Sequence, residues 1–517
     1  MEFSCFSGFQ CFHDSWSSVF LLSSIFLIVI FLPSLIFYLL KLRFSCRCEI
    51  CQVYIKSKWT AQFANLCDWY TYLLKNSPTK TIHIHVLNNT ITANPENVEY
   101  ILKTRFENFP KGKPFSAILG DFLGRGIFNV DGDLWMFQKK MASLELGRAS
   151  IRAYAFQAVN KEIDDRLIPF LESVSCGNSK DEELDLQDVF RQFSFDVICR
   201  FLFGLDPDCF ELSLPLSEFA VSFDLASKLS AERALNLSPI VWKIKRLLNI
   251  GSEQKLQQAI KIVDMLAQEV IRKRRKIGFL NQKDLLSRFM MISSSTTIDE
   301  KFLRDIVISF LLAGRDTVAS ALTSFFRLVA QHPEAEAAIL AEADKRLIGK
   351  NMELSSYEQI RELHYLHAAI YESMRLYPPV QFDSKFCLKD DLLPDGSFLK
   401  RGTRVTYHPY AMGRMEEIWG SDCLEFKPER WLKDGIFIQE LDPFRYPVFQ
   451  GGYRVCLGKE MALVELKSVA VSLLLKFHVK LAESHHHDRS VPRFSPGLTT
   501  TFRDGLRVSI RSRSSII

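Results

Sequence analysis

One cysteine loop constrains this chain more than any other feature. It runs from Phe449 through Cys456 to Gly458 and reads FQGGYRVCLG, and a helical pattern opens directly after it. A thiolate that binds a metal needs backbone N–H groups and a helix N-terminus close by, because both stabilise its negative charge. The glycines permit the tight turn that this requires. Phe449 can shield the sulfur, and Arg454 can hold an anionic group with two hydrogen bonds. The other interpretation is a buried structural cysteine beside a turn.

The spacing favours the metal ligand. All fixed positions of the pattern F-x-x-G-x-R-x-C-x-G are filled. The loop resembles the haem-ligand signature of cytochrome P450 enzymes, the haem-thiolate monooxygenases. The resemblance implies that Cys456 is the axial ligand to the iron of haem b, with Phe449, Gly452 and Arg454 around it. In such sites the thiolate pushes electron density onto the iron and favours O–O cleavage, while the protein positions cofactor and substrate.

Composition limits the remaining possibilities. With 517 residues, 47% of them hydrophobic, the chain can bury a large core, and its net charge of +5 argues against nucleic acid as a partner. Twelve cysteines are too sparse for a disulfide scaffold, so we expect reduced thiols. Cys46, Cys48 and Cys51 form a denser cluster. Free thiols, acylation and metal binding all remain open for it, although no fourth ligand is evident in the sequence.

The N-terminal region has the features of a membrane anchor. Residues 19–40 carry no charge, and their roughly twenty apolar positions suffice to span a bilayer as one helix. A cleaved signal peptide is disfavoured because the apolar run is too long and no basic segment precedes it. Basic residues follow the run, so the positive-inside rule places the body of the protein in the cytosol. We therefore expect a lumenal tail at 1–18, a transmembrane anchor at 19–40, a connector bound close to membrane lipid at 41–75 and the catalytic domain at 76–517.

The next segments give local expectations. Residues 81–86 alternate polar and apolar side chains and predict a strand whose polar face carries His83 and His85 as surface residues. Asn94-Pro95 predicts the start of a helix. Residues 109–133 combine glycines with large apolar side chains and indicate a long loop that either caps the core or forms a pocket lid. Residues 150–290 read as peripheral helices, and His485–His487 as an exposed loop.

A long buried helix is predicted in the middle of the chain. Thr297-x-x-Glu300 has the form of a capping box, and the pattern continues to His332 before a proline. The stretch 313–317, AGRDT, interrupts an otherwise apolar helix. It is either a kink with a back-bonded Thr hydroxyl or a functional break. It resembles the central-helix motif of the P450 family, which implies that Ala313 and Gly314 lie against the haem and that Asp316 and Thr317 supply protons during oxygen activation.

Other positions gain meaning from the same resemblance. Trp135 and Lys139 share a helical face and would hold a haem propionate, although the family usually has arginine at the second position. Glu372-x-x-Arg375, with Arg430 downstream, resembles the family's structural charge triad. Val380 and Phe382 fall on the strand expected over the haem, and Leu498 falls in the closing turn expected to touch substrate.

The expected fold is mainly α with small β-sheets, a cytochrome P450 fold behind a single N-terminal transmembrane helix in the endoplasmic reticulum membrane. Stretches such as ILGDFLGRGIFNVDGDLW, VQFDSKF and YAMGRMEEIWG are similar to plant microsomal fatty-acid ω-hydroxylases, closest to the subgroup that oxidises jasmonoyl-isoleucine. The likeness implies O2 as co-substrate and NADPH-cytochrome P450 reductase as partner, docking near Lys139, Lys140 and Lys459. Tyr453 is a departure from the family pattern, in which proline is frequent at this position.

The substrate expected from the likeness is a small amphipathic acid. Its carboxylate would meet Lys111, Lys113 or Arg125, and its chain would lie along Phe115, Leu119 and Phe128. Three alternatives stay open: a general fatty-acid ω-hydroxylase, a haem-thiolate isomerase or dehydratase that needs no O2, and a non-catalytic haem sensor. Asp316 and Thr317 argue against the last two, which need no proton delivery to O2.

Overall fold

The computed structural model describes most of the chain after the predicted anchor. The described residues are 46–147, 149–176, 183–207, 215–236, 238–280, 282, 284–295, 299–347, 356–438, 441–482 and 491–513. The predicted tail 1–18 and anchor 19–40, together with Thr297 and His485–His487, lie outside them. The chain divides into two compact units, the smaller made of Met1–Trp59 and Ile84–Asn88 and the larger of Thr60–His83 and Asn89–Ile517. Helix α3 (Leu66–Asn76) overlaps the expected connector 41–75 but belongs to the larger unit.

The smaller unit has little regular structure among its described residues. Helix α2 (Glu49–Ile55) begins directly after Cys48, and a short 3-10 turn covers His85–Leu87. The strand predicted for residues 81–86 is shorter than expected, because β1 ends at Ile84 and the chain turns there. Asn88 closes the turn with φ of 47°, a left-handed conformation that asparagine tolerates.

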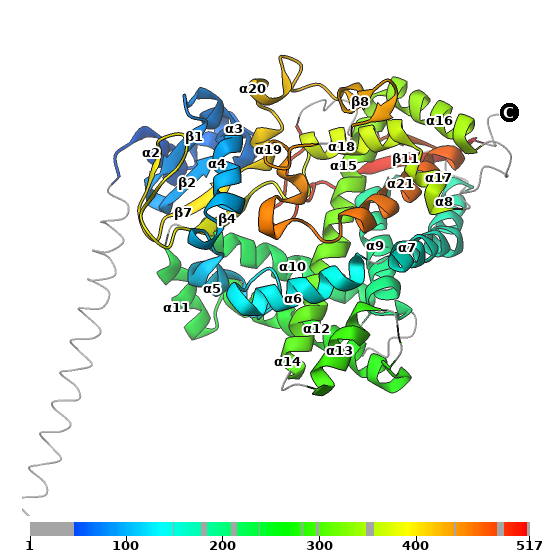
Figure 1. The fold of residues 1–517 in the computed structure, drawn as a ribbon, viewed down its shortest axis with the longest axis horizontal. Coiled ribbons are helices and arrows are strands. Elements are labelled where there is room, and N and C mark those ends of the chain that lie inside the picture. The colour runs from blue at the N-terminus through cyan, green and yellow to red at the C-terminus, as the bar shows by residue number, and fades with distance from the viewer. Residues whose placement is uncertain are drawn as a thin grey trace, which may run out of the picture. The chain divides into compact units, whose positions relative to one another are not determined.

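The larger unit is mainly helical, as the sequence predicted (Figure 1). Its helices are α3 (Leu66–Asn76), α4 (Pro95–Glu99), α5 (Gly112–Leu123), α6 (Gly132–Leu146), α7 (Ala149–Glu162), α8 (Ile168–Ser175), α9 (Leu186–Leu202), α10 (Leu216–Leu235), α11 (Pro239–Leu248), α12 (Ser252–Ile277), α13 (Leu285–Ser295), α14 (Glu300–Leu311), α15 (Thr317–Gln331), α16 (Pro333–Leu347), α17 (Tyr357–Arg361), α18 (His364–Leu376), α19 (Pro409–Met412), α20 (Glu416–Trp419) and α21 (Lys459–Lys476).

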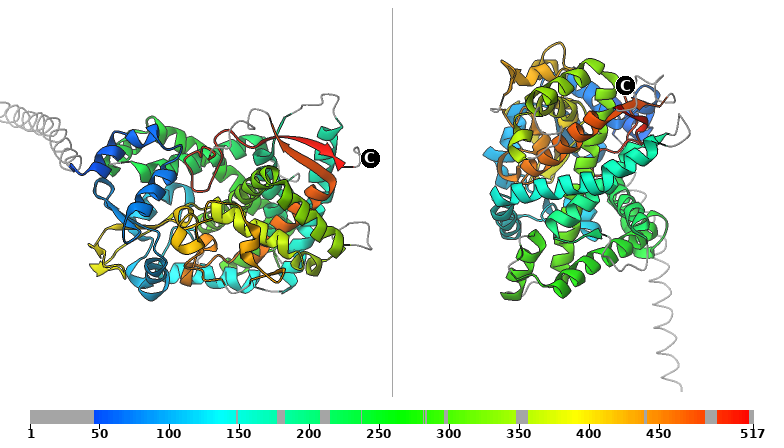
Figure 2. Two further views of the ribbon diagram at one scale, coloured as in Figure 1. Left: turned by 90° about the horizontal axis from the view of Figure 1, so that it is seen from above. Right: turned by 90° about the vertical axis from the view of Figure 1, so that its right-hand side faces the viewer.

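Small sheets complete this unit. One has the strand order β1 (Thr81–Ile84), β2 (Asn89–Thr92), β7 (Arg404–Tyr407) and β4 (Asp383–Phe386), with β2 parallel and β4 antiparallel to β7. A second joins β10 (Phe477–Leu481), β11 (Arg507–Ser512) and β3 (Leu184–Asp185), and two hairpins pair β5 (Asp391–Leu392) with β6 (Phe398–Leu399) and β8 (Leu432–Lys433) with β9 (Ile436–Phe437). The views of Figures 1 and 2 place β11 at the opposite end of the larger unit from β2 and β7.

The central helix is confirmed, and its interruption takes a definite form. Helix α14, one turn of π-helix at Leu312–Asp316 and α15 run continuously from Glu300 to Gln331 through the middle of the larger unit (Figure 1). The first turn is capped by Asp299, whose carboxylate accepts from the Phe302 amide at 2.8 Å. Within the described residues, one helix, Glu300–Gln331, is long and apolar enough to cross a membrane. However, 83% of its most apolar 18-residue segment is buried inside the protein. The apolar side chains of this helix therefore pack into the protein core.

Two local predictions were wrong. The long loop expected at 109–133 contains helix α5, because Phe115, Leu119 and Phe122 recur at helical spacing and the glycines only delimit the helix. The Asp131 carboxylate accepts from the amides of Lys111 and Gly112 at 2.9 and 2.8 Å and caps the helix from outside. The strand expected at Val380–Phe382 begins only at Asp383, because Gln381 hydrogen bonds to the amide of Tyr410 instead of to a neighbouring strand.

Candidate functional site

The cysteine loop folds back on its own backbone. The Cys456 amide donates to the Phe449 carbonyl at 2.8 Å, which closes the loop just before α21. Gly452 has φ of +57°, and a Cβ there would lie 2.2 Å from the carbonyl oxygen of Leu102, so only glycine fits. The Cys456 side chain is exposed to solvent, yet burial raises the pKa of its thiol, and the Gly458 amide and Lys459 offset part of that rise.

The central helix is partly accessible at three neighbouring positions. From Asp305 to Val329 every residue is buried except Ala313, Gly314 and Thr317. These three positions fall on one side of the helix, at the π-helical turn. Ala313, Gly314 and Thr317 are therefore the partly accessible positions, here called the accessible face, in an otherwise buried stretch of the helix.

One apolar cluster joins this face to the cysteine loop. Leu311 and Leu312 belong to it, and Leu457, the neighbour of Cys456, packs against it. The same cluster includes Leu119 and contacts Phe115 and Leu498, three of the residues predicted to touch substrate. Residues next to the thiol, residues next to the break in the central helix and the apolar side of α5 therefore all belong to, or pack against, one extended apolar cluster.

The remaining predicted substrate contacts lie elsewhere or at the surface. Phe382 packs against a separate cluster that contains Phe494 and Phe502. Val380 is half-buried, and Phe128 is exposed, with 38% of its surface accessible. Phe128 is therefore the least suited of the set to line an internal pocket.

Arg454 is held in place from two sides. Its guanidinium lies 4.5 Å from the centre of the Trp135 ring and forms an ion pair of 2.7 Å with Asp131. Burial lowers the pKa of this arginine. Its Nε is buried and has no hydrogen-bond partner within the described part of the chain. A buried cationic donor without a partner is costly unless an anion binds there.

Lys139, predicted to hold a haem propionate together with Trp135, donates to a backbone carbonyl. Its Nζ donates to the Tyr453 carbonyl at 2.5 Å and lies 5.3 Å from the Trp135 ring centre. Burial lowers the pKa of this lysine, and nearby Arg454 adds to the effect. Lys139 therefore ties α6 to the cysteine loop at the residue where the family often has proline.

Sequence reasoning missed a buried charge cluster beside Arg454. Asp383 accepts from Lys111, from Lys385 at 2.5 Å and from the Tyr407 hydroxyl at 2.9 Å. Although burial opposes it, the two lysines hold the pKa of Asp383 well below its usual range. Charges two apart on a strand usually mark a solvated face, so the sequence offered no signal of this burial. Lys111, one of the three cations proposed for a substrate carboxylate, is occupied by this ion pair.

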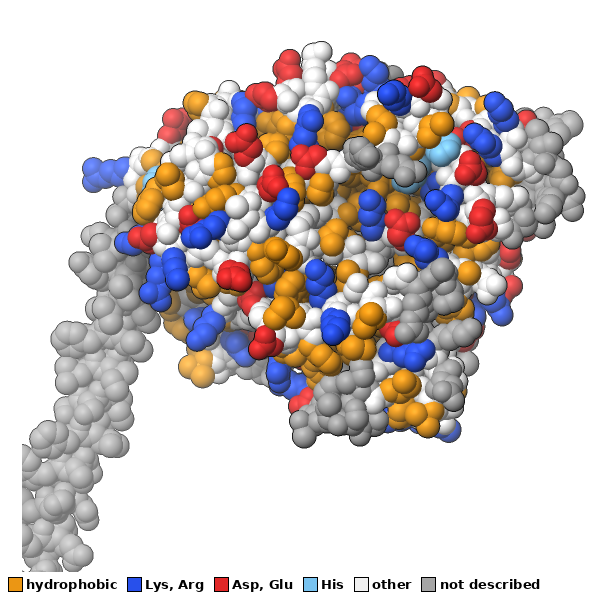
Figure 3. All heavy atoms as spheres, viewed as in Figure 1, with side chains coloured by type: hydrophobic (Ala, Val, Ile, Leu, Met, Phe, Trp, Pro, Cys, Tyr) orange, Lys and Arg blue, Asp and Glu red, His pale blue; other side chains and the backbone are white. Residues whose placement is uncertain are grey.

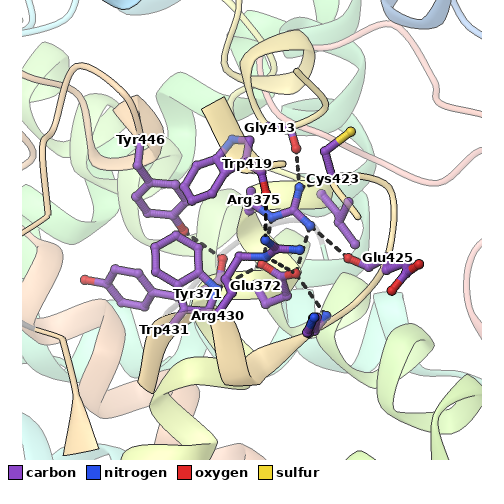
Figure 4. A network of polar contacts seen from close by, with 12 residues as sticks. Tyr371, Glu372, Arg375, Gly413, Trp419, Cys423, Glu425, Arg430, Trp431 and Tyr446 are labelled. Carbon is purple, nitrogen blue, oxygen red and sulfur yellow. Dashed lines mark hydrogen bonds and ion pairs between the residues drawn. The ribbon is translucent and has the colours of Figure 1, made fainter. Parts of the chain in front are cut away.

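The three residues of the predicted charge triad form one buried network (Figure 4). Both carboxylate oxygens of Glu372 accept from Arg375, at 2.7 and 2.8 Å, and one also accepts from Arg430 at 3.0 Å. Arg375 donates further to the carbonyls of Gly413, Cys423 and Glu425. The network cross-links α18 to two loop segments that precede the cysteine loop.

Comparison with known proteins decides the family. The family model described as Cytochrome P450 matches residues 58–501. The chain belongs to the cytochrome P450 family. It is 56% identical to Cytochrome P450 94C1 of Arabidopsis thaliana over 96% of this chain and 99% of that protein. It is 46% identical to Cytochrome P450 94B1 of Arabidopsis thaliana, covering 87% and 88% of the two chains, and 43% identical to Cytochrome P450 94A1 of Vicia sativa, covering 87% of each.

Membership in the P450 family makes the protein a monooxygenase with a thiolate-ligated haem, as the sequence predicted. The residues of this P450 fit that cofactor. The accessible thiol can ligate the iron, the accessible helix face offers small side chains to a flat ring, and Arg454 offers an unpartnered buried donor to a propionate. Gly314 has a second reason to be glycine, because a Cβ there would lie 1.8 Å from Cδ1 of Ile198 in α9.

Proposed function

We propose that this P450 oxidises the terminal carbon of a carboxylate-bearing amphiphile, with jasmonoyl-isoleucine and its 12-hydroxy derivative as substrates and the 12-carboxy derivative as product. The observation that carries the proposal is the apolar cluster that contains Leu119 of α5 and Leu311 and Leu312 of the central helix, with Leu498 packed against it. The similarity to Cytochrome P450 94C1 over almost the whole of both chains supports it.

Cys456, Arg454 and the accessible face at Ala313 would hold the haem. When bound, the haem supplies O2 activation and the oxidation of a C–H bond with electrons from NADPH-cytochrome P450 reductase. The protein's role is to position one carbon of the substrate next to the haem. Terminal C–H bonds are stronger than internal ones, so terminal oxidation requires the apolar wall of Phe115, Leu119 and Leu498 to hold the chain in one direction.

Two residues of the helix break are suited to proton handling. The Thr317 hydroxyl donates to the Ala313 carbonyl at 2.5 Å and stays on the accessible face. Burial raises the pKa of Asp316 to about 6 against the opposing effect of Arg315, which forms a 2.7 Å ion pair with it. Asp316 can therefore exchange a proton near neutral pH, and Thr317 can hold a proton donor at the accessible face.

The substrate carboxylate needs a cation that is not already paired in the core. Lys111 is buried against Asp383, whereas Lys113 and Arg125, at the two ends of α5, are exposed. We assign the carboxylate to the exposed pair, which flanks the apolar side chains of the same helix. The polar end of an amphiphile would then remain near the surface while its chain enters the protein.

Membrane attachment and partner docking complete the proposal. Residues 19–40 anchor the protein in the endoplasmic reticulum membrane with the catalytic domain in the cytosol. The reductase docks on the side that carries Lys139, Lys140 and Lys459. On the face of the molecule shown in Figure 3, basic side chains lie interspersed with acidic ones.

The decisive experiment compares substrates in microsomes that contain the protein and its reductase. We expect jasmonoyl-isoleucine, or its terminal alcohol, to be oxidised faster than a plain medium-chain fatty acid, with oxygen on the terminal carbon. Equal or faster turnover of the fatty acid would make the protein a general fatty-acid ω-hydroxylase. Mainly in-chain products would contradict the proposed direction of the chain along α5.

A further inference from the structure

Three cysteines and one histidine of the smaller unit converge on one point. The Sγ atoms of Cys46, Cys48 and Cys51 and a ring nitrogen of His85 all lie within 4.8 Å of one another. The Sγ atoms of Cys46 and Cys48 are 3.3 Å apart, and Sγ of Cys48 is 3.6 Å from Nδ1 of His85. The catalytic function makes no use of these four side chains.

The local fold sets this arrangement. Cys48 directly precedes α2, and Cys51 lies in the first turn of that helix, so both face the same side as the incoming Cys46. Gln52 of α2 donates to the Cys46 carbonyl at 2.7 Å and fixes the first cysteine against the helix. The fourth residue is distant in sequence and arrives because the chain turns directly after β1, at His85. The main chain of the next residue, Val86, hydrogen bonds to the Cys51 sulfur.

We propose that Cys46, Cys48, Cys51 and His85 bind one Zn²⁺ ion. A tetrahedral zinc with sulfur at about 2.3 Å and nitrogen at about 2.0 Å requires sulfurs about 3.8 Å apart and sulfur about 3.5 Å from nitrogen. The distances of 3.3 and 3.6 Å lie within a few tenths of an ångström of these values. Three thiolates and one imidazole form a recognised structural zinc set with no position left for water.

Burial and sequence separation indicate a structural site. Cys51 is fully buried, Cys46 and Cys48 are half-buried, and His85 closes the cluster from its exposed side. Cys48 and His85 are 37 positions apart, so one ion would cross-link the segment that follows the proposed anchor to the turn after β1. Such a cross-link restricts the unfolded chain and stabilises the folded unit when zinc is present.

The test measures zinc and haem in the full-length, detergent-solubilised protein made in zinc-supplemented medium. We expect about one zinc per chain by elemental mass spectrometry, as a closed four-ligand site requires. Cys48→Ser, His85→Ala and the double variant should each lose most of it. Cys176→Ser, at an exposed cysteine outside the cluster, and His83→Ala, at the neighbouring histidine, should retain it. The carbon monoxide difference spectrum should be the same in all five, because Cys456 is intact.

A second measurement needs no variant. A mercurial thiol reagent should release the zinc of the wild-type protein, and thiol titration after chelation should reveal three additional reactive cysteines. Wild-type protein without zinc, or zinc retained in the double variant, would overturn the proposal. So would an intact mass showing a disulfide or a hydroxylamine-labile acyl group on these cysteines. None of these outcomes bears on the proposed substrate.

Discussion

The guanidinium of Arg454 stacks over the indole of Trp135, with 4.5 Å between the guanidinium carbon and the ring centre. The ion pair with Asp131 fixes the same arginine from its Nη2 side. Its buried Nε remains without a partner among the described residues. The stack and the ion pair therefore orient a donor toward a group that the protein itself does not supply, and a haem propionate has the matching charge.

Arg454→Gln should lower the haem-to-protein ratio several-fold, because it removes the cation and the ion pair with Asp131. Lys139→Gln is the matched control, since Lys139 donates to the Tyr453 carbonyl and should affect haem retention less. The ratio of Soret to protein absorbance after gel filtration measures both. An equal loss of haem in the two variants would show that Arg454 and Lys139 together hold the cofactor.

Cys456→Ser should abolish monooxygenase activity and the thiolate-type carbon monoxide band, because a hydroxyl cannot supply the charge of a thiolate to the iron. The control is Cys423→Ser, at a buried cysteine whose thiol donates to the Arg414 carbonyl at 3.3 Å. That variant should keep the band. A normal band in Cys456→Ser would assign the iron to another ligand.

The parts of the site that the sequence predicted depend on local patterns. The cysteine loop and the AGRDT break both lie in short segments whose chemistry can be recognised without the fold. Glu372 and Arg375 are one helical turn apart, so their pairing follows from spacing alone. The central helix was predictable because its apolar run is long and ends at Pro333.

The parts that could not be predicted depend on contacts between distant segments. Lys111 meets Asp383 across 272 positions, and nothing in either local pattern signals that both are buried. His85 was predicted as a surface residue and is exposed, but its proximity to the three cysteines could not be predicted, because it depends on the turn after Ile84. Helix α5 was not predicted, because the glycines of this segment indicated a loop although its apolar residues recur at helical spacing.

Gly314→Ala should destabilise the protein by about 1–3 kcal/mol, the usual range for overpacking, because the new methyl group would overlap Ile198. Ile198→Ala should be destabilising alone through the cavity it creates. The double variant should be more stable than the sum of the two, since each change relieves the other. Thermal unfolding of all four proteins measures this coupling, and strict additivity would show that the two helices move apart instead.

Thr317→Ala should keep haem and substrate binding but divert NADPH consumption toward hydrogen peroxide, because the hydroxyl no longer holds a proton donor at the accessible face. Thr323→Ala is a closely matched control. Its hydroxyl makes the same bond to the carbonyl four residues earlier, at 2.7 Å, but it is buried. Peroxide formed per NADPH should rise only in the first variant. A rise in both would mean that the hydroxyls act through helix geometry.

Glu465 in α21 should make stability depend on pH. Its side chain is buried, and one carboxyl oxygen lacks a hydrogen-bond partner among the described residues. Burial raises the pKa of Glu465 to about 8, while Ser194 lowers it slightly. The folded protein therefore keeps this proton at neutral pH, whereas the unfolded chain releases it above about pH 4.3. Stability should fall as pH rises between these two values and then become independent of this group.

Glu465→Gln should remove that dependence, because the amide stays neutral in both states. At pH 8 we expect the variant to unfold at a higher temperature than the wild type. The two pKa values correspond to a stability difference on the order of 5 kcal/mol, which should shrink towards pH 5. Glu460→Gln, at an exposed position of the same helix, should leave the pH profile unchanged. A Glu465→Gln midpoint below the wild type at pH 8 would mean that the buried carboxylate is ionised and has a cationic partner in the folded protein.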